Sequence, residues 1–79
     1  MKYALYYYDA CPFCQRVLRV LPEIKVDVEK RNVRMEPKWS RQQDEETGRT
    51  QVPCLLIDNN GKHEWLYESA DIIRYLQSR

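Results

Sequence analysis

The spacing of hydrophobic and polar residues divides the 79-residue chain into short elements. An apolar, aromatic run over residues 3–8 predicts a strand covered on both faces, because apolar side chains occupy nearly every position. Residues 12–21 carry apolar side chains at helical spacing, and Pro22 ends that helix. Residues 24–28 alternate and predict a second strand. The three elements form a βαβ unit, which implies two parallel strands.

The middle of the chain is more polar. Residues 29–36 are charged and give no clear assignment. Residues 37–47 predict a helix that starts with a proline and is followed by Gly48. Met35 and Trp39 are its large apolar candidates, so we expect a peripheral helix with one shallow contact.

The last third predicts a hairpin and a helix. Residues 52–57 form a third strand, residues 58–61 a turn, and residues 62–66 its antiparallel partner. A helix then opens near Ser69, a good N-cap residue. Its expected buried stripe consists of Ala70, Ile72, Ile73 and Leu76. We therefore expect one α/β domain over residues 1–79, with the order β-α-β-α-β-β-α and helices flanking a four-stranded mixed sheet.

Pro53 does not fit an ordinary central strand, because proline removes a hydrogen bond from the ladder. A cis Val52–Pro53 bond would turn the chain just before the strand and resolve the conflict. Cis is the minority form of such bonds, so the pattern alone leaves this open.

Charge and cysteine content restrict the function classes. The chain has 13 basic and 12 acidic side chains, a net charge of +1, which gives no case for binding nucleic acid or an anionic membrane. No secretory leader or transmembrane segment follows the first methionine, so we expect a cytoplasmic protein. Three cysteines is an odd number for a disulfide scaffold. We interpret these thiols as chemically active ones in a reducing compartment.

The sequence Cys11-Pro12-Phe13-Cys14 falls where the first strand ends and the first helix begins. A helix N-terminus offers free N–H groups and a partial positive charge, which stabilise a thiolate. Cys11 is therefore the candidate nucleophile. Cys14, one turn further on the same side, can attack a mixed disulfide formed at Cys11. Pro12 suits the first helical position, which needs no N–H.

These features together resemble the glutaredoxins, within the thioredoxin-like fold. The motif at Cys11–Cys14, the Gln51-Val52-Pro53 segment before a strand, and a polar helix start carry this resemblance over nearly the whole chain. It implies a cis Val52–Pro53 bond facing the cysteines and glutathione as co-substrate. The Val52 backbone would pair with the cysteinyl part of glutathione, and Ser69 at the last helix would take the γ-glutamyl carboxylate.

The chain departs from the glutaredoxin pattern in its second half. Leu66-Tyr67-Glu68-Ser69 replaces the usual Gly-Gly, and Cys54 directly follows the proline. This half looks more like the N-terminal domain of glutathione transferases, in which a Glu-Ser pair holds the γ-glutamyl group. By that resemblance Glu68 binds the glutathione amino group.

The resemblance also implies contacts at the rim of the site. The glycine carboxylate of glutathione needs a cation, and Arg49 is favoured over Arg41 and Lys38 because it lies just before Val52. Tyr8 ends the strand that leads to Cys11 and could touch the ligand. The lysine often found before the first cysteine is absent; Asp9 stands near and opposes a thiolate, which Arg16 could partly offset.

We thus predict a glutathione-dependent thiol–disulfide oxidoreductase that acts on disulfide-containing or glutathionylated proteins as a monomer, with no metal required. Two other classes stay open: a non-catalytic glutathione- or protein-binding domain of transferase type, and an iron–sulfur cluster carrier. The cysteines with His63 could also form a Cys3His zinc set, although the spacing is wrong for common zinc modules. The simpler interpretations are a buried apolar Cys54, a surface His63, and a solvated helix face over residues 41–46.

Overall fold

The computed structural model describes all residues from 1 to 79. The elements in chain order are β1 (Lys2–Tyr7), α1 (Pro12–Val20), the short 3₁₀ helix η1 (Leu21–Glu23), β2 (Val28–Asn32), α2 (Pro37–Thr47), β3 (Cys54–Asn59), β4 (Lys62–Tyr67) and α3 (Ser69–Gln77). The predicted order is confirmed, with η1 as an addition at Pro22. The strands form one mixed sheet in the order β2-β1-β3-β4, in which only β1 and β2 are parallel. None of the helices is long and apolar enough to cross a lipid bilayer.

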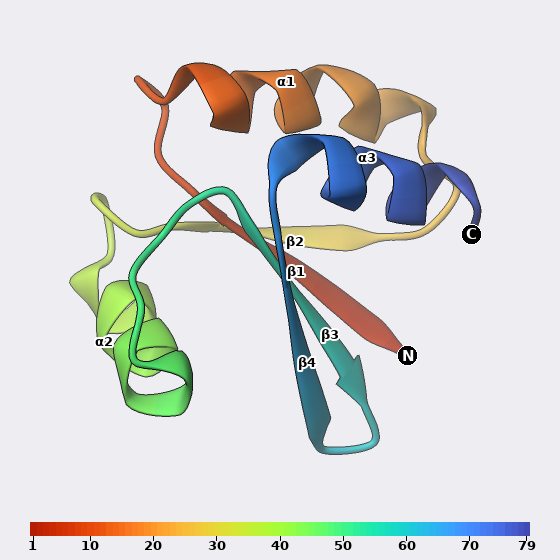
Figure 1. Cartoon of the computed structure of the whole chain (residues 1–79). Helices are drawn as coiled ribbons and strands as arrows, with labels where there is room; N and C mark the ends of the chain where they lie inside the picture. The colour runs from red at the N-terminus through yellow and green to blue at the C-terminus, as the bar shows by residue number, and fades with distance from the viewer.

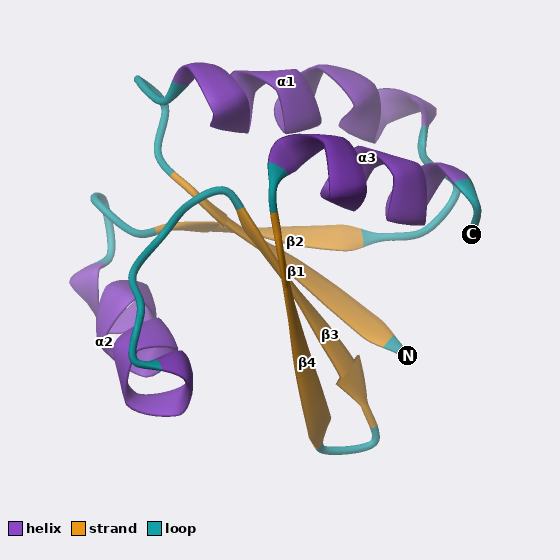
Figure 2. Ribbon diagram, in the orientation of Figure 1, coloured by secondary structure: helices purple, strands orange, loops and turns teal.

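Helices cover both faces of the sheet. Figure 1 shows α1 and α3 side by side on one face and α2 on the other, and Figure 2 shows the same three layers by element type. Successive side chains of a strand point to opposite faces. Tyr3 and Leu5 of the central strand β1 therefore belong to one core cluster, and Ala4 and Tyr6 belong to another. This double burial explains why the β1 sequence is apolar at nearly every position.

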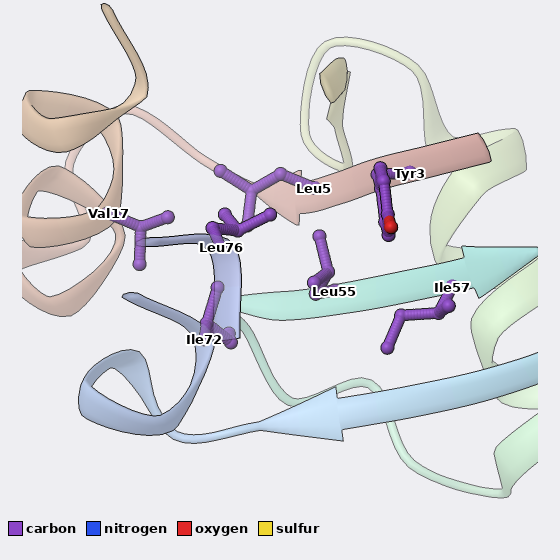
Figure 3. Close-up of a cluster of buried hydrophobic side chains, with 7 residues drawn as sticks. All are labelled: Tyr3, Leu5, Val17, Leu55, Ile57, Ile72 and Leu76. Atoms are coloured by element: carbon purple, nitrogen blue, oxygen red, sulfur yellow. The ribbon is translucent and has the colours of Figure 1, made fainter. Parts of the chain in front are cut away.

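The larger core cluster lies between the sheet and the pair α1 and α3. Figure 3 shows its members: Tyr3, Leu5, Val17, Leu55, Ile57, Ile72 and Leu76. The smaller cluster, on the α2 face, holds Cys54 and Leu56 beside Ala4 and Tyr6, with Trp39 of α2 packed against it. Trp39 is thus the shallow contact expected for this helix, whereas Met35 is 77% exposed. Leu55 is fully buried in the larger cluster, so truncating it to alanine would cost about 2–5 kcal/mol.

The second strand was predicted in the wrong place. The alternating segment 24–28 does not pair with β1; the pairing starts at Val28 and runs to Asn32, opposite Tyr3 to Tyr7. Ile24 and Val26 alternate because they pack against the larger core cluster from an irregular segment. β2 lies at the edge of the sheet and is partly exposed, so its charged residues carry no strand pattern.

Two further boundaries differ from the sequence prediction. β3 begins at Cys54, and Val52 and Pro53 lie outside the strand, so Pro53 removes no ladder hydrogen bond. The N-cap of α3 is Glu68 rather than Ser69, which is the first helical residue. Ala70 does not belong to the buried stripe of α3, because it is exposed and lines a surface hollow at the start of the helix.

Candidate functional site

Cys11 closes the N-terminus of α1. It is the N-cap residue, and Pro12 occupies the first helical position, as the sequence predicts. The Cys11 Sγ atom accepts a hydrogen bond from the Cys14 N–H at 3.3 Å, and its carbonyl accepts one from the Gln15 N–H at 3.0 Å. The sulfur thus replaces the oxygen of an ordinary capping side chain at the positive end of the helix. Cys11 is 5% exposed to solvent.

The other two cysteines are fully buried free thiols. Burial raises the pKa of the Cys14 thiol to about 12, and the neighbouring Cys11 sulfur adds to the rise. Burial raises the pKa of Cys54 to about 11, although Tyr67 and Gln43 beside it act in the opposite direction. Cys54 thus occupies the buried position expected for a small apolar residue. At neutral pH both of these side chains are neutral thiols.

The segment before β3 presents unpaired backbone. The Val52–Pro53 peptide bond is cis, as the glutaredoxin resemblance implies. Neither the N–H nor the carbonyl of Val52 takes part in a hydrogen bond within the chain, and Val52 belongs to no helix or strand. These two groups can therefore pair with an extended ligand backbone in the way that an added strand does.

The start of α3 holds a residue in an unusual backbone conformation. Glu68 has φ 72°, in the left-handed region that favours glycine, and this marks the position where the glutaredoxin pattern has Gly-Gly. Its side chain makes no capping hydrogen bond to the helix; instead its Oε1 accepts one from Gln51 Nε2 at 3.3 Å. The first backbone bond of the helix runs from the Ile72 N–H to the Glu68 carbonyl, so the N–H groups before Ile72 have no partner inside the helix.

One hollow joins these features. It has a volume of about 340 Å³ and is lined by Phe13, Arg16, Gln51, Val52, Pro53, Glu68, Ser69 and Ala70. Five of the predicted glutathione-binding residues thus lie together, next to the first turns of α1. The volume lies at the lower end of the range for small-molecule sites. A larger hollow of about 600 Å³ near the start of β1 is lined by none of the predicted site residues, so size alone does not identify the site.

The remaining predicted residues do not line this hollow, and the two predicted catalytic residues Cys11 and Cys14 are among them. Arg49 bonds to the Gln51 side chain and stacks on the Tyr67 ring, 4.1 Å from its centroid, so it is one residue removed from the lining. Tyr8 stacks against Arg34 and meets the site only through its carbonyl, which accepts the Cys11 N–H at 3.3 Å. Lys38 pairs with Glu36 at the far end of α2.

Sequence reasoning missed three lining residues, Phe13, Arg16 and Ala70. Phe13 is one of the apolar residues whose spacing predicts a helix over residues 12–21, and such a residue is expected to be buried. It is nevertheless 55% exposed, and the Arg16 guanidinium stacks on its ring, 5.2 Å from the centroid. Spacing gave a signal for the pair, because residues three apart share a helix face. Arg16 is the cation that lines the hollow, a position that the sequence assigned to Arg49.

No group of three or more His, Cys, Asp or Glu side chains is placed to hold a metal ion. The residues of the Cys3His alternative are not brought together. His63 lies on the surface, where its Nδ1 contacts Glu46 Oε1 at 2.6 Å.

The fold and the hollow define a thioredoxin-like domain with a site beside its cis-proline segment. Comparison with protein families gives a narrower answer: the profile of the glutathione S-transferase N-terminal domain matches residues 5–79. The chain therefore belongs to the glutathione S-transferase N-terminal domain family. No curated protein matches the sequence.

Solved structures agree with this membership. A glutathione S-transferase from the Antarctic clam Laternula elliptica is 30% identical with a TM-score of 0.71, over 99% of this chain and 35% of that chain. A trimeric glutathione transferase from Leishmania is 30% identical with a TM-score of 0.73, over 96% of this chain and 17% of that one. An omega-class transferase from Trametes versicolor, 19% identical, has a TM-score of 0.73 over 98% of this chain and 36% of its own, and shares the fold. The chain spans about a third or less of the length of these proteins.

Proposed function

We propose that this domain is a glutathione-dependent thiol–disulfide oxidoreductase that reduces disulfide-containing or glutathionylated proteins through Cys11. One observation carries the proposal: the unpaired Val52 peptide groups and the open N-terminus of α3 line a single hollow at the helix that Cys11 caps. The first two features suit the peptide and the carboxylate of glutathione. The third supports Cys11 as the nucleophile, because Cys11 is the N-cap of the helix whose residues Phe13 and Arg16 line the same hollow. The family supports the choice of glutathione as ligand.

Each end of glutathione has a suitable partner. The Val52 N–H and carbonyl can pair with the cysteinyl residue of the tripeptide. Ser69 and the free N–H groups of α3 suit the γ-glutamyl carboxylate, and the Glu68 carboxylate suits the adjacent ammonium group. Arg16 also lines the hollow, and its guanidinium can donate hydrogen bonds to the glycine carboxylate. Because Arg49 is occupied by Gln51 and Tyr67, we assign this role to Arg16 in preference to Arg49.

The reaction consists of two thiol–disulfide exchanges. The Cys11 thiolate attacks the glutathionyl sulfur of a protein–glutathione disulfide; a Cys11–glutathione bond forms, the original S–S bond breaks, and the protein thiolate leaves and takes up a proton. A second glutathione, as its thiolate, then attacks the Cys11-bound glutathionyl sulfur. This step yields glutathione disulfide and returns the Cys11 thiolate. In the net reaction the protein thiol is regenerated, one glutathione thiol is oxidised, and the glutathione removed from the protein leaves as half of glutathione disulfide.

Cys14 contributes little to the second step in this scheme. It is fully buried, and with a pKa of about 12 it is a thiol at neutral pH. Only the thiolate attacks a disulfide, so free glutathione, with an ordinary thiol pKa of about 8.5, supplies far more nucleophile. We therefore propose that glutathione, rather than Cys14, regenerates Cys11.

The test is glutathione-dependent reduction of a small mixed disulfide, with Cys11→Ser and Cys14→Ser as matched variants. We expect turnover by the wild type, loss of turnover in Cys11→Ser, and retained turnover in Cys14→Ser. Equal activity of Cys11→Ser and the wild type would contradict the proposal.

A second candidate, a non-catalytic glutathione-binding domain, is favoured by the low exposure of Cys11, 5%. Binding of glutathione by a wild-type protein without turnover would support this candidate and reject the enzyme. The binding measurement is made with S-methylglutathione, which cannot exchange.

A further inference from the structure

A fully buried glutamine connects α2 to the segment that carries Val52. Gln43 lies on α2 with no exposed surface, although the sequence predicted a solvated face there. Its Nε2 donates a hydrogen bond to the Gln51 carbonyl at 2.8 Å. That carbonyl belongs to the peptide unit whose nitrogen is the unpaired N–H of Val52. The Gln43 amide therefore bonds to the very peptide group that the proposed function uses.

The rest of the same segment is also tied to α2. The Thr47 hydroxyl accepts the Arg49 N–H at 3.0 Å and lies 2.7 Å from the Gln43 carbonyl and 2.8 Å from the Arg49 carbonyl, either of which can accept its single proton. The Gly48 N–H closes the helix on the Asp44 carbonyl at 2.8 Å. Gln43 supplies the last tie before Val52, and nothing else in the chain bonds to the Gln51 carbonyl.

The oxygen atom of the Gln43 side-chain amide is not paired. Its Oε1 is buried and has no hydrogen-bond partner, and the same is true of the Tyr67 hydroxyl. Both side chains adjoin the buried Cys54 thiol. A buried acceptor left unpaired destabilises the folded state, whereas an apolar side chain of the same length would avoid this penalty. The amide at position 43 is therefore not explained by stability alone: besides its contact with the Cys54 thiol, it donates a hydrogen bond to the peptide before Val52.

We propose that Gln43 is a positioning residue that fixes the Gln51–Val52 peptide for pairing with glutathione. The inference rests on the proposed function, because it assigns Gln43 a role in holding the ligand-binding backbone. Gln43 itself does not line the hollow. It acts by fixing the orientation of the peptide plane, so that the Val52 N–H points to the ligand before the ligand arrives. Such preorganisation raises affinity by lowering the ordering cost of binding.

The experiment replaces Gln43 by methionine, which keeps the length and removes both the donor and the unpaired acceptor. Binding of S-methylglutathione is measured by calorimetry, and stability by urea unfolding. We expect the dissociation constant to rise about 3- to 10-fold, as for the loss of one hydrogen bond. The urea midpoint should stay equal or rise. In the exchange assay, KM for the glutathione mixed disulfide should rise while kcat is retained, because the substitution leaves Cys11, the N-cap of α1, unchanged.

The matched control is Gln42→Met, one residue earlier on the same helix. The Gln42 side chain bonds to the Tyr6 hydroxyl, Arg31 and Glu46, and it makes no hydrogen bond to the segment before β3. We expect this variant to lower the urea midpoint and leave the dissociation constant unchanged.

The outcomes separate the two proposals. Wild-type protein that does not bind S-methylglutathione would overturn the proposed function and this inference with it. Wild-type binding with an unchanged dissociation constant in Gln43→Met would overturn the inference alone. A Gln43→Met protein that is markedly destabilised or unfolded would also overturn it, because the amide would then serve stability.

Discussion

Helices α1 and α3 begin beside the same hollow, yet their N-termini are built in opposite ways. The first turn of α1 is capped from within, because the Cys11 sulfur accepts the Cys14 N–H. The first turn of α3 has no side-chain cap, and its N-cap residue Glu68 adopts a positive φ while its carboxylate bonds to Gln51. Both ends carry the partial positive charge of a helix N-terminus.

The difference shows how one electrostatic feature can serve two tasks. At α1 the field acts on a sulfur that belongs to the chain, which favours a nucleophile. At α3 the N–H groups are left without a partner in the chain, which favours an anion from outside. A chain with two closed N-termini would lack a recognition site, and a chain with two open ones would lack a reactive group. Five predictions test this division, from the largest expected effect to the smallest.

The largest effect concerns the reactivity of the three thiols. With iodoacetamide at pH 8, we expect Cys11 to be alkylated first, and Cys14 and Cys54 to be alkylated at least about 100-fold more slowly. At a pH three units below its pKa, a thiol is only about 0.1% ionised, and only the thiolate reacts. Both slow thiols are also fully buried, with pKa values of about 12 and about 11. Peptide mass spectrometry after timed quenching gives the rates. Alkylation of Cys14 before Cys11 would reverse the roles assigned to the two cysteines.

Removing the carboxylate at α3 should weaken ligand binding next most strongly. We expect Glu68→Ala to raise the dissociation constant for S-methylglutathione about 10- to 100-fold, the usual range for losing a hydrogen bond to a charged group. Alkylation of Cys11 should proceed at the wild-type rate, since α1 is unchanged. A similar loss of affinity and of Cys11 reactivity would mean that the two N-termini do not act separately.

The hydroxyl at the same helix should matter less. Ser69→Ala removes one neutral group from the wall of the hollow, and we expect a rise in the dissociation constant of about 2- to 10-fold. The matched control Ser78→Ala changes a serine at the other end of α3 and should leave affinity unchanged. Calorimetry with S-methylglutathione measures both. Equal effects of the two substitutions would show that Ser69 has no ligand role.

The backbone at Glu68 should cost stability. Glycine adopts a positive φ without a steric penalty. The free energy of unfolding, measured with urea, should therefore be about 1 kcal/mol higher for Glu68→Gly than for Glu68→Ala. Both variants lack the carboxylate, and their affinities should be equally low. Equal stability of the two would indicate that the conformation at position 68 relaxes when the side chain is shortened.

The smallest expected effect is on stability, and it concerns α2, a helix whose N-terminus lies outside the comparison of α1 with α3. Glu46 of α2 raises the pKa of His63, Asp58 of β3 adds to this, and Arg31 of β2 opposes it. Because the pKa of His63 is higher in the folded state than in the unfolded state, protonation of His63 stabilises the fold. This contribution is fully present below the unfolded-state pKa of about 6.5 and is lost as pH rises through the folded-state pKa. We expect urea unfolding to show a loss of less than about 1 kcal/mol between pH 6 and pH 8, absent in His63→Gln. If His63→Gln lost as much stability as the wild type between pH 6 and pH 8, the pH dependence would come from a group other than His63.

The accuracy of the sequence predictions followed the degree of burial. β1 and the Cys11–Cys14 turn were predicted correctly because their chemistry is local: a doubly buried strand needs apolar residues throughout, and a helix start favours proline. β2 was misplaced because an edge strand exposes one side and tolerates charged residues such as Glu29 and Lys30. Ser69 was taken as a cap because it is the better capping residue type. The structure uses Glu68 instead, at a positive φ that no propensity predicts for glutamate.

The sequence alone determined the Cys11–Cys14 motif at the start of a helix, the element order and the set of residues around Val52 and Glu68. Each of these depends on residue type and short-range spacing, which can be taken directly from the amino-acid sequence. Tertiary structure alone decided which cation lines the hollow, how deeply Cys14 is buried, and that Gln43 reaches the peptide before Val52. These properties depend on how α1, α2 and α3 pack around the sheet. Since packing brings together residues far apart in the chain, no local pattern could reveal it.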